Sequence, residues 1–546
     1  MRHTRTMLQL TRRDFLATCA TLTAAGLLVA CAPTSQPSPP PAQPTAALPA
    51  SQQPPAAAPT VKSTGPKKGG TLTMARTIRL VEFNPLNTVG GHNAFMRAMF
   101  NTLLQYDEKL QPQPQLAEKW DLSADGKVIT LKLRQGVKFH SGREFTSADV
   151  KFTHEYASQD EVVQLRSSYR EIKKVETPDK YTVVLSFDKV NPGLFDTLDM
   201  MYIIDKETFA DRSKTAIGTG PFKLEKFVPN DRVEMVAFKD YWDTGKPYLD
   251  GYVAREIPDL ASIMINLEAG AIDCVQAPSA VDMPRLKAAG DKYVIDMGSP
   301  GQEMFNLAIN VKAPPFTDKR VRRAMAWSID RARLCRTALG GLVEPTCLMW
   351  PTHSWAYFKD LEGKVGYDLD KAKALLKEAG LEKGFETEIL SSTKRGVGFM
   401  DLAQMLQADL KKIGVNAKIT DAEEAVFQAR MNSADIVMAT HSYGRANRDP
   451  GMLMAGAKAW YNEKEGNWTR WNSDVWDGLR KDLNSTLDKE KRLPIARKLQ
   501  EMALDECFTN PIAAGLRGMW AYTGYVKGFS YDLSNTINPV GIWLDK

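Results

Sequence analysis

The sequence lacks the short motifs that mark the common enzyme classes. It has no G-x-S-x-G, no H-E-x-x-H and no Walker loop. His154-Glu155 has no second histidine four positions on, and the glycine-rich segment 218–221 (GTGP) opens an expected strand. A strand offers no helix N-terminus to a phosphate, so we interpret this segment as a backbone turn. These absences predict a protein that is not an enzyme and that needs no cofactor.

Strong charge and metal-ligand spacing are also missing. The whole chain has a formal charge of +6. Residues 1–30, which we expect to be cleaved off as an export signal, carry four arginines and one aspartate, so the mature chain has a formal charge of +3. Such a balance gives no electrostatic footprint for nucleic acid. There is no C-x-x-C, and His92 and His441 have no partner at ligand spacing. We therefore predict no bound metal.

Cysteine is scarce, with six in 546 residues. Cys19 and Cys31 lie within the first 31 residues, where we expect an export signal and its cleavage site. Four cysteines lie in the body of the chain: Cys274, Cys335, Cys347 and Cys507. Four cysteines allow three pairings outside the cytoplasm. They could equally be buried, unpaired thiols, and the sequence leaves both alternatives open.

Long apolar runs are absent as well. The run 17–30 is shorter than the roughly 20 residues that span a bilayer. It follows Arg12 and Arg13, in the form of a twin-arginine export signal, and residues 28–31 (LVAC) resemble a lipobox. We predict a signal peptide at 1–30, although an ordinary signal with a chance cysteine is the alternative. Cys31 would then carry the lipid that is the sole membrane anchor.

Proline is concentrated directly after this cysteine, with eleven prolines in residues 32–66. Such a stretch cannot bury enough apolar surface to fold. We therefore expect residues 31–68 to form a lipidated, disordered linker. The folded body would sit outside the cytoplasm, in the periplasm or on the outer face of the cytoplasmic membrane.

The body from residue 69 shows strand and helix patterns throughout. In its first part we expect strands at 71–75, 128–133 and 181–187, and helices at 92–104, from 146 and at 259–269. From residue 305 strands and helices alternate, with strands at 305–310, 385–392, 415–419 and 435–440 and helices at 317–334, 368–379, 402–413 and around Phe427. This alternation predicts βαβ units and a parallel sheet.

Four segments resemble the family 5 extracellular solute-binding proteins of ABC importers, the dipeptide, oligopeptide and nickel-binding class. They are LAEKWDLSADGKVITLKLRQGVKFHSGREFTSADVKFTHEY (116–156), GTGPFKLEKF (218–227), FNLAINVKAPPFTDKRVRRAMAWSIDR (305–331) and YDLDKAKALLKEAG (367–380). The resemblance implies an α/β fold, a two-lobed clamp of the periplasmic-binding-protein type II with an inserted α+β domain. One lobe would comprise 69–104, 206–304 and 511–546, the inserted domain 105–205, and the other lobe 305–510.

The resemblance also implies a site. Peptide-binding relatives place the aspartate of a Gly-Trp-x-x-Asp segment on the free amine of the ligand. The matching segment here is HSYGRANRDPGML (441–453), in which Tyr443 takes the aromatic position and Ala446 the place of the aspartate. Arg445 and Arg448 stand beside this gap, and Arg79 lies in another expected cleft loop. An arginine fork suits carboxylate or phosphate.

Aromatic residues add further candidates. Flat side chains often line binding sites, although each one alone is more often part of a core. We expect Phe95, Trp350 and Trp468 in the cleft, with Trp355 and Trp471 as further candidates, and assign Trp327 to a core. The alternative for Arg445 and Arg448 is a solvated loop position, since the register has an uncertainty of about 2–4 residues.

The predicted function is capture of a peptide or peptide-like small solute, and its delivery by a monomer to an ABC permease and ATPase on other chains. The missing aspartate leaves open an anionic or sugar-like solute, or a peptide in another pose, in the same import role. A surface hydrolase and a solute sensor without transport are further alternatives.

Overall fold

The computed structural model describes most of the body of the chain. The described residues are 65–77, 83–86, 95–107, 111–159, 163, 166–212, 215–278, 282–296, 303–341, 343–395, 398–444, 448–515 and 519–546. The expected signal, Cys31 and most of the linker lie outside them, as do His92, Arg79, Arg445 and Ala446. Residues Thr64–Lys546 form one compact unit.

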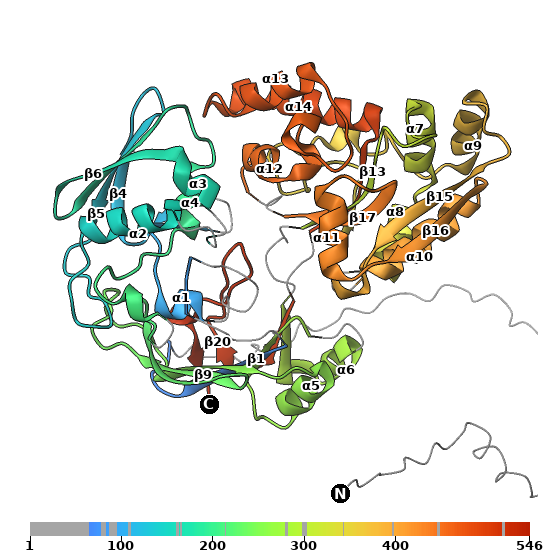
Figure 1. The fold of residues 1–546 in the computed structure, drawn as a ribbon. Helices are drawn as coiled ribbons and strands as arrows, with labels where there is room; N and C mark the ends of the chain where they lie inside the picture. The colour runs from blue at the N-terminus through green and yellow to red at the C-terminus, as the bar shows by residue number, and fades with distance from the viewer. Residues whose placement is uncertain are drawn as a thin grey trace, which may run out of the picture. The chain divides into compact units, whose positions relative to one another are not determined.

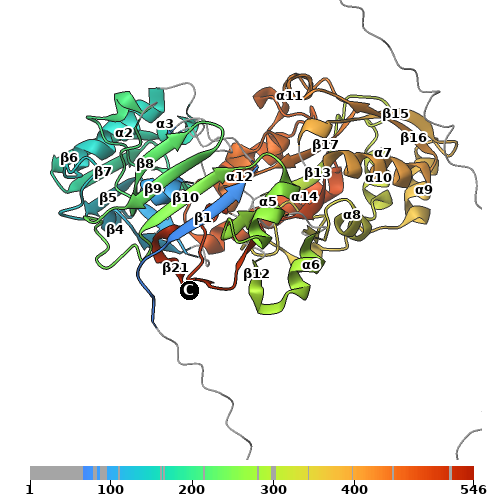
Figure 2. The ribbon, with the colours of Figure 1, turned by 90° about the horizontal axis from the view of Figure 1, so that it is seen from below.

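A seven-stranded sheet gathers segments from both ends of the chain (Figures 1 and 2). β1 (Thr71–Arg76) pairs in parallel with β10 (Gly251–Glu256) and β11 (Cys274–Gln276), and the outer strands are antiparallel. Helices α5 (Leu260–Glu268) and α6 (Met283–Ala288) share a core with one face. The strand order is β12 (Tyr293–Asp296), β19 (Trp520–Thr523), β11 (Cys274–Gln276), β1 (Thr71–Arg76), β10 (Gly251–Glu256), β9 (Arg232–Ala237) and β8 (Phe222–Val228).

A separate four-stranded antiparallel sheet lies within residues 117–187. Its order is β4 (Ala117–Leu122), β5 (Val128–Leu133), β7 (Thr182–Phe187) and β6 (Ile172–Asp179). Helices α2 (Ser147–Gln159), α3 (Arg166–Glu171) and α4 (Leu194–Met200) accompany it, and it has its own apolar core. We call these elements the inserted domain. Both expected strands, 128–133 and 181–187, are confirmed.

A six-stranded sheet organises the back half. β15 (Phe385–Ser391) pairs in parallel with β16 (Val415–Asp421) and β17 (Met438–Tyr443), and the other strands of the sheet are antiparallel. The predicted βαβ units are therefore confirmed for these three strands, with α10 (Phe399–Lys411) and α11 (Glu424–Asn432) as crossovers. The order is β14 (Glu344–Pro345), β18 (Thr509–Ala514), β13 (Met304–Ile309), β17 (Met438–Tyr443), β15 (Phe385–Ser391) and β16 (Val415–Asp421).

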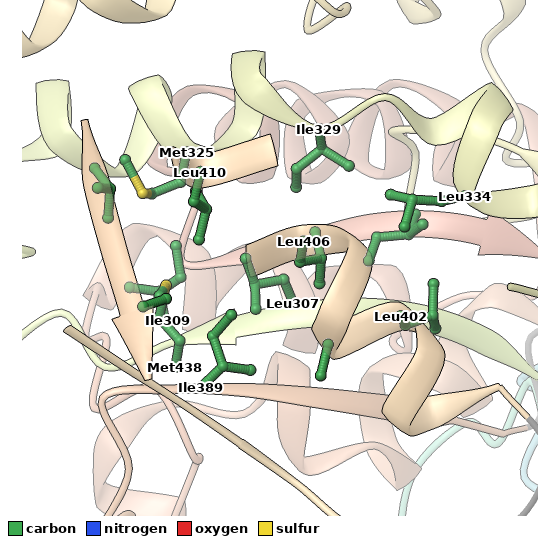
Figure 3. Close-up of a cluster of buried hydrophobic side chains, with 14 of the residues drawn as sticks. Leu307, Ile309, Met325, Ile329, Leu334, Ile389, Leu402, Leu406, Leu410 and Met438 are labelled. Carbon is green, nitrogen blue, oxygen red and sulfur yellow. The ribbon is translucent and has the colours of Figure 1, made fainter. Parts of the chain in front are cut away.

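This sheet is buried on both faces, because successive side chains alternate between two cores. Leu307 and Ile309 face a cluster that includes α10, as Figure 3 shows. Met304 and Ala308 on the same strand face the other cluster. The first cluster also takes α7 (Lys319–Ser328), α8 (Arg331–Thr337) and α9 (Leu369–Glu378), and the second α12 (Pro450–Gly456), α13 (Asp474–Leu483) and α14 (Lys489–Glu506).

Two predicted helices are wrong in their extent. The helix expected at 92–104 is only the single turn α1 (Met96–Met99), and β2 (Leu104–Tyr106) already begins at its predicted end and pairs with β3 (Pro112–Pro114). The helix expected at 317–334 is broken between α7 and α8, because Asp330 starts a new helix by accepting a bond from Arg333 N at 3.0 Å. Apolar spacing alone does not reveal such interruptions.

The chain passes between the two large sheets twice. It leaves the seven-stranded sheet after β12 and enters the six-stranded sheet at β13, and it returns between β18 and β19. Gly515 N donates to Glu303 O at 2.9 Å, so the two crossings are hydrogen-bonded to each other. The expected boundary at residue 511 falls inside β18, which belongs to the six-stranded sheet. We call the elements around the two sheets the first lobe (seven strands) and the second lobe (six strands).

Cys274, Cys335, Cys347 and Cys507 are free and buried, which decides between the two alternatives that the sequence left open. Trp327 lies in a core, as predicted. Within the described ranges no three metal-ligating side chains cluster. Nor does any helix of those ranges have the length and apolarity to cross a bilayer.

Candidate functional site

Ligands of open α/β sheets bind beyond the carboxyl ends of parallel strands. In the first lobe β1 and β10 end side by side at Arg76 and Glu256. Burial lowers the pKa of Arg76 to about 10. In the second lobe β17 ends at Tyr443, shortly before Arg448. These two strand ends are where the fold places a candidate site.

Three predicted aromatic residues of the second lobe belong to one core. Trp350 is fully buried, and Tyr443 donates its hydroxyl to Met349 O at 3.1 Å. The ring of Trp468 lies 3.9 Å from that of His441. Trp471 belongs to the same core, and the partly buried Trp355 packs against it.

Phe95 belongs to a different core, in the first lobe, where its ring lies 5.3 Å from that of Phe83. The structure therefore does not bring all the predicted aromatic residues together. Their contact with a solute stays a prediction.

Arg448 is buried among carboxylates. Its Nη1 lies 3.1 Å from Asp199 Oδ2 and 3.5 Å from Asp196 Oδ1, and its Nη2 donates to Ser534 Oγ at 3.3 Å. Its side chain is 1% exposed. This geometry is not that of a solvated loop arginine, which was the alternative for Arg448. The guanidinium instead joins the second lobe to α4 of the inserted domain.

Arg97 of α1 extends the same group of charges. It donates to Asp532 Oδ2 at 2.9 Å and to Asp199 Oδ1 at 3.1 Å. Asp199 Oδ1 also accepts a bond from Tyr106 N. We call Arg97, Asp196, Asp199, Arg448 and Asp532 the junction cluster, because its members come from both lobes and from the inserted domain.

The junction cluster holds three carboxylates and two guanidinium groups. Burial raises the pKa of Asp196 to about 6, although Arg448 opposes the shift. Burial alone would lower the pKa of Arg97, but Tyr202 and the carboxylates of Asp532 and Asp199 raise it above its ordinary value. Both arginines therefore stay charged, and the cluster is held together by buried ion pairs.

Sequence reasoning missed four of these five residues, although two local signals were present. Arg97 is the one charge in the apolar run 95–100, and Asp196 and Asp199 stand three apart in the largely apolar segment 193–202. Charged residues are almost never fully buried without a partner. A charge within an apolar run therefore indicates a buried pair, but the sequence does not say with which residue.

The glycine-rich segment 218–221 packs the first lobe against α1. A Cβ on Gly220 would lie 2.4 Å from Ala98 O, and one on Gly218 would lie 2.0 Å from Met99 O. His140 of the segment after β5 seals this contact. Gly218 N donates to His140 Nδ1 at 3.3 Å, and His140 Nε2 donates to Gly220 O at 3.0 Å. The segment is thus a close backbone contact rather than a phosphate loop.

His140 predicts an acid-sensitive contact. Burial lowers the pKa of His140 to about 4. The native protein then binds fewer protons than the unfolded chain below pH 6.5, so stability falls as the pH drops from 6.5 towards 4. When the pH is lowered from 7 to 4.5, the free energy of unfolding of the native protein should fall by about 2–3 kcal/mol more than that of His140→Gln, as measured by urea unfolding. Parallel pH curves for the two proteins would contradict this assignment.

Comparison with known proteins now places the fold. Residues 111–464 match the model of the bacterial extracellular solute-binding proteins, family 5. The chain belongs to this family. Its members are solute-binding proteins of ABC importers and act outside the cytoplasm. The family's fold, the type II periplasmic-binding-protein fold, is the predicted one.

Family 5 relatives match over most of their length. The dipeptide-binding protein of Escherichia coli K12 is 29% identical over 467 residues, which cover 78% of this chain and 85% of the relative. The oligopeptide-binding protein AppA of Bacillus subtilis is 30% identical over 68% of this chain and 73% of its own. The structure of DppA from Helicobacter pylori with the peptide STSA has 25% identity and a TM-score of 0.73, covering 88% of this chain and 99% of that one.

Proposed function

We propose that this protein captures a peptide or peptide-like small solute outside the cytoplasm and delivers it to the permease of an ABC importer. Membership of family 5 carries the proposal. Several relatives are dipeptide-, oligopeptide- or glutathione-binding proteins, which supports a peptide-like solute. No bond needs to be broken in this role, which fits the sequence's lack of catalytic motifs.

The fold suits capture by closure. Each lobe has its own sheet and core, and two hydrogen-bonded crossings connect them. Two rigid bodies joined in this way can rotate about the crossings and enclose a solute. A solute shifts the lobes towards the closed form only by its differential affinity for the two forms. A permease can then distinguish the loaded protein from the empty one.

Native mass spectrometry of the mature protein purified from its own cells tests the proposal. A bound mass that fragments into amino acids is expected, and calorimetry with that peptide should reproduce the binding. A non-peptide mass would overturn the peptide assignment but leave the import role. Formation of a product during incubation with the solute would overturn the role itself and favour a surface hydrolase.

One observation favours a second candidate, an anionic or sugar-like solute in the same import role. Ala446 stands where peptide-binding relatives have the aspartate for the ligand amine, with Arg445 beside it. An ammonium buried without a carboxylate would be costly. Calorimetry should then show binding of carboxylated sugars that Arg445→Ala abolishes. Tight binding of unmodified short peptides that is unchanged in Arg445→Ala would refute this candidate.

We further propose that the mature protein is tethered through a lipid on Cys31. Replacing Cys31 by serine is expected to move the protein from the membrane fraction to the soluble extracytoplasmic fraction, because no other anchor is predicted. Cys19→Ser is the matched control, since Cys19 would leave with the signal peptide. Retention of Cys31→Ser in washed membranes would contradict the tether. Arg12→Lys with Arg13→Lys should block export and so tests the twin-arginine signal separately.

A further inference from the structure

Charges fasten the segment after β17 to the inserted domain. Arg448 contacts Asp199 and Asp196, both of which lie on α4. The neighbouring Asp449 N donates to Asp196 Oδ2 at 3.3 Å. Three polar contacts therefore connect the second lobe with α4 of the inserted domain.

The first lobe meets the same point. Arg448 Nη2 donates to Ser534 Oγ at 3.3 Å, and Ser534 N donates to Asp532 Oδ1 at 2.8 Å. Asp532 in turn accepts from Arg97. Arg448 is thus held by residues of both the first lobe and the inserted domain, and any movement of the second lobe away from them must break these contacts.

The ion pairs of Arg448 with Asp196 and Asp199 are buried, so breaking them is costly. The side chains of Arg448, Asp196 and Asp199 are 1–2% exposed. Removing one partner of a buried pair leaves an uncompensated charge, which strongly disfavours the arrangement that buries it. The same contacts also occupy the carboxylates of Asp196 and Asp199, so these groups already have a cation from the chain itself.

We propose that Arg448 is a latch that holds the second lobe to the inserted domain and to the first lobe when no solute is bound. Its guanidinium already pairs with Asp196 and Asp199, so this contact needs no cation from a solute. The latch therefore stabilises the closed form of the empty protein, and it does not depend on the proposed function.

The structure offers a second way to open the latch without changing a charge. Gly193 starts α4 with a φ of −87°, which any residue can adopt. A Cβ there would lie 2.0 Å from Met452 Sδ on α12 of the second lobe. The branched side chain of Gly193→Leu would act as a wedge between α4 and α12.

Distance measurement between two labels tests the latch in the absence of solute. Cysteines replace the exposed residues Glu155 on α2 and Lys498 on α14, and spin labels report the distance between the inserted domain and the second lobe. The unliganded native protein should show a measurable closed population beside the open one. Arg448→Met and Gly193→Leu should each lower the closed-to-open ratio at least tenfold, whereas Arg448→Lys, which keeps a cation, should lower it less than Arg448→Met.

Arg322→Met is the matched control. Arg322 is a buried arginine whose ion pair with Glu506, at 2.8 Å, lies wholly within the second lobe. Its loss should lower stability but leave the label distance of the folded protein unchanged. If Arg448→Met keeps the native distance distribution, or if Arg322→Met opens the protein equally, the latch is overturned.

Discussion

Arg97→Met is expected to lower the free energy of unfolding by about 3–5 kcal/mol. The guanidinium of Arg97 is 5% exposed and contacts Asp199 and Asp532, whose side chains are 2% and 4% exposed. Methionine fills a similar volume but leaves both carboxylates without this cation. The change can be measured by urea unfolding at pH 7, followed by circular dichroism.

Arg320→Met serves as the control for this substitution. Arg320 also pairs with an aspartate, Asp318, but at the surface, where solvent screens the charges. Its unfolding midpoint should equal that of the native protein. An equal loss of stability in the two variants would show that burial is not the cause. A native-like Arg97→Met would contradict the role of the ion pairs in the junction cluster.

Gly220→Ala is expected to cost about 3 kcal/mol or more, or to prevent folding. The new Cβ would lie 2.4 Å from Ala98 O, 2.5 Å from Met99 C and 2.7 Å from Phe100 N. All three are backbone atoms, so no side-chain rotation relieves the contact. Soluble yield and the urea midpoint measure the effect.

Gly478→Ala is the matched control for the steric argument. Gly478 lies within α13, and apart from the backbone of its own helix and its chain neighbours no atom lies within 4 Å of the position of its Cβ. Alanine in a helix interior is favoured over glycine by roughly 0.5–1 kcal/mol, so this variant should be slightly more stable than the native protein. A stable Gly220→Ala would show that α1 can move away from the segment 218–221.

The helices expected at 259–269 and 368–379 are confirmed as α5 and α9, because the residues that begin and end them act locally. Asp368 caps α9 by accepting a bond from Lys371 N at 2.9 Å, and Asp259 caps α5 in the same way. The turn at Pro229-Asn230-Asp231 joins β8 to β9, with Asn230 at a φ of 58°. Each signal acts within a few residues, and it therefore gives the same result in the isolated sequence and in the fold.

The errors arise where distant segments decide the outcome. The apolar spacing of 92–104 fits a helix, but residues 99–102 are instead bonded to segments far along the chain. Gly220 N donates to Met99 O, Ile203 N to Asn101 O, and Thr102 bridges to Tyr202. These partners are about 100 residues away, so no pattern within the segment could have predicted an end after one turn.

The candidate site was predictable to a similar degree. The segment 441–453 was singled out from the sequence, and Arg448 within it does lie at a junction of three parts of the chain. The sequence could not show that its partners are Asp196, Asp199 and Ser534, because charge pairing depends on which loops the sheets bring together. The sequence suggested that the guanidinium of Arg448 is free to bind an anionic solute. In the structure it is instead paired with the carboxylates of Asp196 and Asp199.

The residues by themselves determined the alternation of strands and helices, the caps and turns between them, and the family to which the chain belongs, since all of these are written in short-range spacing and in contiguous motifs. The tertiary structure alone decided that four cysteines stay unpaired in cores and that Arg97 and Arg448 share Asp199. The physical reason is that the stability of a buried charge depends on partners distant in sequence, which only the packing of the lobes and the inserted domain brings within hydrogen-bonding distance.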